Sequence, residues 1–411
     1  MKKKILTLMS ALTFAASTGC NGTEIVAASN TAGTVVDKAK NSEITFTDVA
    51  GHWAREAIEK AVQKGYVDGY EDGSFRADHN VSRAEFLKMV LTALKEPVNR
   101  SSLGAEWAAP YIAIAKDKGI LLDSDFQLDK FNEPITRLEM SRIAVRATDK
   151  DLQNPNMHMD DNSFMYNATK KGLIQGLAGG ELGTDKSTTR AQSVTIIERM
   201  LSVKAGVQLE VDKYAVGNAE LALKKTNIFS MIPEFSGPQS TYTYWSPDKL
   251  TITTPDGNFK GSIDQVVAID LEDPNDPHRD MLGDINELHW DDGTYRVGTL
   301  KPLVKDALHS YVILVKSHVD YNNDTSAYAE NENPSLSIYG FTSPYSSPMI
   351  DGKLSTLAQV FKNVRGDMNA FIIPKQGSTA PRGIDLTISI PARPPVSDQS
   401  HTITSILNIK E

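Results

Sequence analysis

The sequence is poor in the features that stabilise or localise many proteins. Its only cysteine is Cys20, so no disulfide can form within the chain and packing has to supply the stability. Its longest apolar run, from Ile5 to about Ala16, is too short for a membrane-spanning helix, which needs roughly 20 residues. Positive charge is scarce too, since 43 Lys and Arg against 52 Asp and Glu give a formal net charge of −9. We therefore expect no membrane span and no general nucleic-acid binding. An anionic ligand would have to bind at a local cluster of positively charged groups, because the chain as a whole is acidic.

The N-terminus predicts export. Three lysines at residues 2–4 precede the apolar run and small residues follow it, which is the layout of a signal peptide over residues 1–28. Two processing sites stay open. The Val-Ala-Ala of residues 26–28 suits an ordinary signal peptidase, whereas the Ser-Thr-Gly-Cys of residues 17–20 resembles a lipoprotein box that would be lipidated at Cys20.

A repeat with a period of 53 to 54 residues occupies the first half of the chain. Because 411 residues exceed what one hydrophobic core organises, two or three packed regions are expected. We assign the three copies to residues 43–96, 97–150 and 151–205. Equivalent positions are Trp53 and Trp107, then Gly65, Gly119 and Gly172, then Arg83, Arg137 and Arg190.

Each copy is predicted to fold as helix, loop and helix. In the first copy, apolar residues at helical spacing end at Gly65, a typical residue after a helix C-terminus. The second helix of each copy is predicted to begin at a capping box, in which a hydroxyl and an acid or amide satisfy two backbone N–H groups. The three boxes are Ser82 with Glu85, Thr136 with Glu139, and Thr189 with Gln192.

These residues resemble the S-layer homology family, whose repeats open with Phe-x-Asp-Val and Trp-Ala and close on Thr-Arg-Ala-Glu. The first copy matches throughout, with Phe46, Asp48, Val49, Trp53, Ala54, the Gly69-Tyr70-x-Asp72-Gly73-x-Phe75 loop, and Ser82 to Glu85. The second copy keeps Trp107 and its Arg motif but has Ser102 in place of the aspartate. The third keeps its Arg motif and has no tryptophan.

The resemblance covers about 165 residues and implies an all-α, three-repeat, pseudo-trimeric prism at the cell surface. It further implies that grooves of this prism bind secondary cell-wall polysaccharide, which often carries pyruvate ketals and is then acidic. The implied role is a non-covalent anchor on the wall of a Gram-positive bacterium.

The candidate ligand residues are of three kinds. Arg83, Arg137 and Arg190 each follow a helix N-cap, where a guanidinium fork and unpaired N–H groups would hold a carboxylate. A sugar ring could stack on Trp53, Trp107 or Tyr70. For Asp48 we weigh a ligand-binding role and a structural role equally. On this hypothesis Arg83→Ala should weaken wall attachment far more than it lowers the melting temperature. The alternative is that the arginines bind carbonyls or acids between repeats and that the tryptophans are core residues.

The second half of the chain is predicted to be a mainly-β, sandwich-like domain of unknown function over residues 240–411, after a linker over 206–239 with a helix near Ala219 to Lys225. A helix is also expected over Leu354 to Val364. The eight predicted strands are Tyr242 to Trp245, Leu250 to Thr254, Val266 to Leu271, Tyr311 to Val319, Leu336 to Phe341, Ala370 to Ile373, Ile384 to Ile390 and Thr402 to Leu407.

No residue pattern in this half identifies chemistry. The acid-rich residues 272–280 could hold Ca²⁺, but their irregular spacing favours a solvated loop. The histidines have no metal-ligand spacing, so no metal, cofactor or catalytic residue is predicted. We therefore expect a non-enzymatic surface protein, and the alternatives are a wall-anchored hydrolase and a lattice-forming S-layer subunit.

Overall fold

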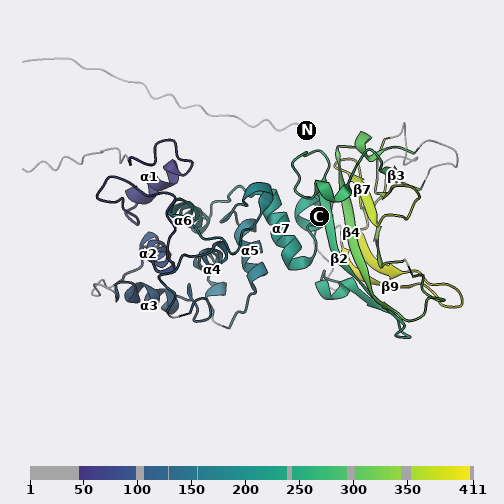
Figure 1. The fold of residues 1–411 in the computed structure, drawn as a ribbon, viewed down its shortest axis with the longest axis horizontal. Coiled ribbons are helices and arrows are strands. Elements are labelled where there is room, and N and C mark those ends of the chain that lie inside the picture. The colour runs from purple at the N-terminus through teal and green to yellow at the C-terminus, as the bar shows by residue number, and fades with distance from the viewer. Residues whose placement is uncertain are drawn as a thin grey trace, which may run out of the picture. The chain divides into compact units, whose positions relative to one another are not determined.

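The computed structural model describes residues 46–98, 106–127, 129–154, 156–237, 243–293, 301–330, 332–343 and 353–407. The predicted signal peptide, both of its processing sites, Ser102 and Tyr242 lie outside the described residues. Within them, a helical region precedes two antiparallel sheets (Figure 1).

Each repeat contains the two predicted helices. They are α1 (Arg55–Gln63) and α2 (Arg83–Ala93), α3 (Ala109–Asp117) and α4 (Arg137–Thr148), and α5 (Asp161–Lys170) and α6 (Arg190–Lys204). All three capping boxes are confirmed, because each N-cap side chain accepts from the third helical N–H and the side chain there accepts in return. Short 3₁₀ helices lie at Asp151–Gln153 and Ala178–Gly180.

The repeats are joined in a closed cycle of backbone hydrogen bonds just before the second helices. Val81 N–H donates to the Thr188 carbonyl at 3.0 Å, Thr188 N–H donates to Ile135 at 3.0 Å, and Ile135 N–H donates to Val81 at 2.9 Å. Each first helix also packs on the second helix of the preceding copy, α3 on α2, α5 on α4, and α1 on α6. The first copy therefore closes against the third.

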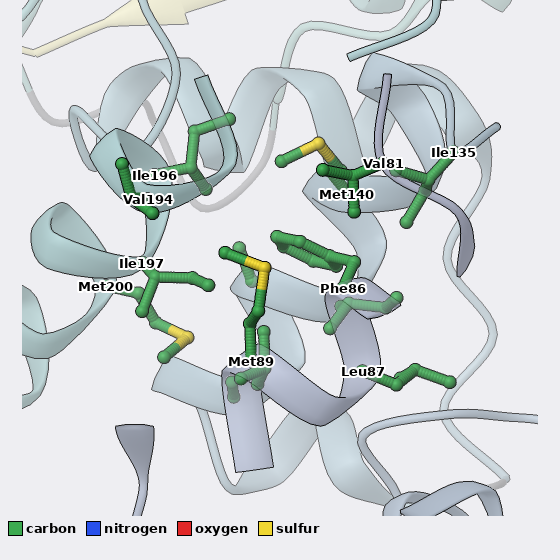
Figure 2. Close-up of a cluster of buried hydrophobic side chains, with 14 of the residues drawn as sticks. Val81, Phe86, Leu87, Met89, Ile135, Met140, Val194, Ile196, Ile197 and Met200 are labelled. Atoms are coloured by element: carbon green, nitrogen blue, oxygen red, sulfur yellow. The ribbon is translucent and has the colours of Figure 1, made fainter. Parts of the chain in front are cut away.

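A single hydrophobic core fills the space that this cycle encloses. Figure 2 shows Phe86 and Met89 of α2, Met140 of α4, and Ile197 and Met200 of α6 pointing toward one another. These side chains are 0 to 4% exposed. One helix pair could not bury such a surface alone, so the three copies stabilise one another.

The segment that was predicted to be a linker is folded. It contains α7 (Lys213–Lys224), which confirms the helix expected near Ala219, and the short α8 (Ile228–Met231) and 3₁₀ helix Pro233–Phe235. Ile228 and Phe235 are fully buried in the same hydrophobic cluster as strand residues. These residues therefore belong to the core of the β-rich region.

The β-rich region has a six-stranded sheet in the order β1-β2-β4-β7-β6-β3 and a three-stranded sheet in the order β5-β8-β9, both antiparallel (Figure 1). The strands are β1 (Thr251–Thr253), β2 (Phe259–Asp270), β3 (His289–Asp291), β4 (Ser310–Asn322), β5 (Ser335–Tyr339), β6 (Ala358–Phe361), β7 (Ala370–Pro374), β8 (Ile384–Ile390) and β9 (Gln399–Ile406). Short 3₁₀ helices lie at Pro247–Leu250, Arg279–Leu282 and Val304–Asp306.

The two sheets share one core, as a sandwich requires. Residues of the large sheet such as Phe259 and Val266 lie in the same cluster as Leu386 and Ile388 of the small sheet. The opposite face of the large sheet is covered as well, because Val267 and Trp290 belong to a second cluster formed with the connecting segments.

Seven of the eight predicted strands are present, and two predictions are wrong. Residues 243–245 of the first predicted strand form no strand. The helix expected over Leu354 to Val364 is replaced by β6, which pairs with β3 on one side and β7 on the other. The apolar pattern correctly indicated burial, since Ala358, Val360 and Phe361 are all buried. They are buried among cross-strand neighbours rather than along one face of a helix.

Candidate functional site

The guanidinium of Arg83 is held by the second repeat. Its Nε and Nη2 donate to Glu139 at 3.1 and 2.8 Å, and its Nη1 donates to Glu133 at 3.1 Å and to the Lys130 carbonyl at 2.9 Å. The side chain is 11% exposed. Burial opposes its charge, but the hydrogen bonds to Glu139 and Glu133 outweigh burial and raise the pKa of Arg83. This fork therefore already binds acids between repeats.

The equivalent arginines also reach into the next repeat, but they meet backbone carbonyls. Arg137 donates to Leu182 and Gln175 at 2.8 and 2.7 Å. Arg190 donates to Phe75 and Asp68 at 3.0 Å each. Burial lowers the pKa of Arg137, while the charge of Glu181 opposes that shift. The three arginines thus donate from the first copy to the second, from the second to the third and from the third to the first, which is the reverse of the direction of the backbone cycle at Val81, Ile135 and Thr188.

The N–H groups at these helix starts are not free, in contrast to the expectation from the sequence. Arg83 N–H donates to the Glu133 carbonyl, Arg137 N–H to Lys186, and Arg190 N–H to His79, at 2.9 to 3.1 Å. The next residue of each helix donates to the same neighbouring loop. The alternative assignment of the arginines to contacts between repeats therefore describes their observed hydrogen bonds, and their ligand contact stays a prediction.

Asp48 holds the first loop in place. Its carboxylate accepts the backbone N–H groups of Phe75, Arg76 and Ala77 at 2.7, 2.6 and 3.4 Å. Slight burial acts to raise the pKa of Asp48, but these three donors outweigh it and lower the pKa. Its hydrogen bonds are those of a structural residue.

A groove lined by residues of all three repeats contains two of the predicted residues. Trp53 and Arg137 line it together with Gln175, Gln192 and Arg199, and its volume is about 150 Å³. Trp53 is 65% exposed, so its interpretation as a core residue is wrong. The lining contains two guanidinium groups and no carboxylate.

Arg199 on α6 is the residue that sequence reasoning missed. Among the described residues its side chain has no hydrogen bond or ion pair, although it is half-buried. Burial alone lowers its pKa. A half-buried cation without a counter-charge is unfavourable unless a ligand supplies one. The signal that could have found it is its offset of nine residues from Arg190, which Arg146 repeats from Arg137.

The comparison with Arg146 explains why position 199 stands out. Arg146 is 4% exposed and forms a two-point ion pair with Asp125, with N–O distances of 2.5 and 3.1 Å. Among the described residues that line the groove with Arg199, none is an acid. The third capping box also carries Gln192 where the first two have glutamate, and this keeps negative charge out of the groove.

The remaining two candidates are aromatic residues that lie close to cations. Tyr70 lies beneath the guanidinium groups of Arg76 and Arg190, whose Cζ atoms are 3.7 and 5.2 Å from the ring centroid. Trp107 is partly buried against the core, with the Lys88 ammonium 5.7 Å from its ring. The structure thus places Arg190 over Tyr70, and it places Trp53 and Arg137 in the lining of one groove.

Among the described residues, no group of three His, Cys, Asp or Glu side chains is arranged to hold a metal ion. In the acid-rich residues 272–280, Asp276 is buried and accepts the N–H groups of Asp270 and His278 at 2.8 Å each. Glu272 pairs with Lys375 at 2.8 Å. The solvated-loop interpretation is therefore wrong for Asp276, which stabilises the turn after β2.

Comparison with known proteins agrees with the resemblance. Residues 45–87 match the S-layer homology domain, so the chain contains such a domain, and the match supports a location at the cell surface. It is 28% identical to an amylopullulanase of Thermoanaerobacterium thermosulfurigenes over 182 residues, which are 40% of this chain and 10% of that protein. It is 26% identical to the S-layer protein sap of Bacillus anthracis, over 38% of this chain and 21% of that protein.

A third relative is the cellulosome-anchoring protein of Acetivibrio thermocellus, which is 33% identical over 16% of this chain and 15% of its own length. The chain therefore matches about a fifth or less of the length of each of these relatives. No helix among the described residues is long and apolar enough to cross a membrane.

Proposed function

We propose that the three repeats form a pseudo-trimeric helical prism that anchors this exported protein non-covalently to the wall. The proposed ligand is acidic, pyruvylated secondary cell-wall polysaccharide. The observation that carries the proposal is the groove lined by exposed Trp53 and by half-buried Arg199, which has no partner among the described residues. None of the described residues that line this groove is an acid.

The groove suits a carboxylate on a sugar ring. The fork of Arg199 can donate two hydrogen bonds to one carboxylate, and partial burial strengthens that interaction relative to water. The indole of Trp53 offers a flat apolar surface to the ring that carries the substituent. A volume of about 150 Å³ holds the acidic substituent, while the rest of the polymer lies along the surface.

The three motif arginines take a different part in this proposal. Arg83, Arg137 and Arg190 fix each repeat to the next, and so they set the width of the grooves. Arg137 also lines the groove and adds positive charge there. Tyr70, Trp107 and Arg190 are proposed to form a second, weaker subsite, because Glu85 occupies the position of Gln192.

We propose that the β-rich region is displayed outward and is not a catalyst. The glycosidase name of a relative such as the amylopullulanase describes a protein of which this chain matches only 10%. A lattice-forming subunit is the alternative that the relative from Bacillus anthracis suggests.

The proposal is tested by co-sedimentation of the protein with purified walls. Arg199→Ala removes the unpartnered cation, and Gln192→Glu puts a negative charge into the groove while keeping the capping box that the other repeats build with glutamate. Both variants should lower the fraction bound at least tenfold with little change in melting temperature.

The matched control is Lys60→Ala, which removes an exposed cation on α1 that pairs with Glu56 on the surface. This variant should sediment like the parent, since surface ion pairs contribute little. Retention of Arg199→Ala and Gln192→Glu at the level of Lys60→Ala would refute the groove as the binding site.

A further inference from the structure

The large sheet is twice as wide as the small one, and a cleft of about 820 Å³ lies beside the small sheet's edge strand β5. Such a volume is within the roughly 300–1,000 Å³ of small-molecule sites. Its floor contains one row of directly paired residues: Asp291 of β3 opposite Gln359 of β6, and Gln359 opposite Phe371 of β7. Directly opposite residues share a face of a sheet, so all three side chains line the cleft together.

The polar groups of this row are held in place. Asp291 is 7% exposed, and its Oδ1 accepts the N–H of Gly293 at 2.7 Å. Gln359 Oε1 accepts from Arg365 Nε at 2.9 Å, which orients the amide. The Gln359 amide nitrogen has no hydrogen bond to any residue that the structure describes. An oriented carboxylate and a free amide donor therefore flank the half-buried ring of Phe371.

We propose that this cleft binds a neutral oligosaccharide. A carboxylate accepts hydrogen bonds from the hydroxyl groups of a sugar, and an amide N–H₂ donates hydrogen bonds to neighbouring hydroxyl groups. An aromatic ring packs on the apolar face of the sugar. The charge of the lining favours a neutral ligand over an acidic one. Four carboxylates line the cleft against two cations; they are Asp291, Asp292, Glu332 and Asp367 against Lys316 and Arg365.

The cleft is less suited to an extended peptide. Addition of a peptide strand needs free backbone groups along the open edge of β5, whose partner among the described strands is β8. The side chain of Asn369 already occupies this edge, because it donates to the Pro334 carbonyl at 3.2 Å and accepts the N–H of Leu336 at 3.4 Å. Its amide takes the place that a neighbouring peptide unit would fill.

This site is independent of the proposed wall anchor, because it lies in the β-rich region and takes an uncharged ligand. The test is calorimetric titration of the signal-peptide-free chain with cellohexaose, with chitohexaose and with polygalacturonate. Binding of either neutral hexasaccharide supports the site, and preference between the two identifies a glucan or an amino-sugar polymer as its source. Binding of neither, or equal binding of polygalacturonate, overturns the proposal.

Two variants locate the binding. Gln359→Ala should weaken it about tenfold, the equivalent of one lost hydrogen bond, and Phe371→Leu should weaken it while keeping an apolar side chain against the core. Unchanged far-ultraviolet circular dichroism verifies the fold of each. Arg199→Ala is the control, since it should lose wall retention and keep hexasaccharide binding. Hexasaccharide affinity that is unchanged in Gln359→Ala and Phe371→Leu would overturn the assignment to this cleft.

Discussion

Arg83 and Arg199 should respond in opposite ways to replacement by alanine. Arg83→Ala removes four hydrogen bonds to the second repeat and leaves Glu139, whose side chain is 13% exposed, without its cation. Removing one partner of a buried pair costs about 3–5 kcal/mol. Glu139 keeps its capping contact with the Thr136 N–H, so we expect a loss of about 2–4 kcal/mol.

For a domain of this size that loss lowers the melting temperature by about 4–16 °C. Arg199→Ala removes a half-buried cation with no described partner, so the melting temperature should stay within about 2 °C of the parent or rise. Differential scanning calorimetry of both variants measures the contrast. Equal losses of stability would contradict the division into a positioning arginine and a ligand arginine.

Three further predictions concern the same repeats. Thr188→Val should raise the free energy of unfolding in urea by about 1 kcal/mol, because the buried Thr188 hydroxyl has no partner among the described residues. The equivalent positions of the other repeats are the apolar Val81 and Ile135. A loss of stability in this variant would contradict the prediction. Asp48→Asn should lose about 1 kcal/mol at pH 7, and because the folded-state pKa is lowered, the difference from the parent should vanish as the pH falls below about 4; a constant difference would contradict this. Gly65→Ala should lower the free energy of unfolding by about 1 kcal/mol, because only its positive φ disfavours a side chain. Gly119→Ala should lower it clearly more, because the added Cβ would clash with the Gln153 carbonyl. Equal losses in thermal unfolding would refute this prediction.

The local structure of the repeats could be predicted because local signals and packing agree there. The Ser82–Glu85 capping box and the glycine after α1 need only neighbouring residues, so the sequence reports them directly. The period in turn predicted that the copies pack together. The hydrogen bonds between Arg83 and Glu139 join residues that are 56 positions apart in the sequence. Neither repeat motif contains a local signal that predicts this pair.

Sequence patterns failed where long-range pairing decides the outcome. Leu354, Leu357 and Phe361 fit a helical stripe, yet β3 and β7 supply ladder partners that favour a strand. Arg199 was missed for a similar reason. Its importance comes from the lack of an acid like Asp125 nearby, and only the three-dimensional arrangement reveals which charges are left without a partner.

Titration of the protein with purified wall polymer, before and after chemical removal of its acidic substituents, tests the central claim most directly. The account predicts that the intact polymer binds the parent, that the stripped polymer binds at least tenfold more weakly, and that Arg199→Ala binds both forms equally weakly. Equal affinity of the parent for the two polymers would contradict it.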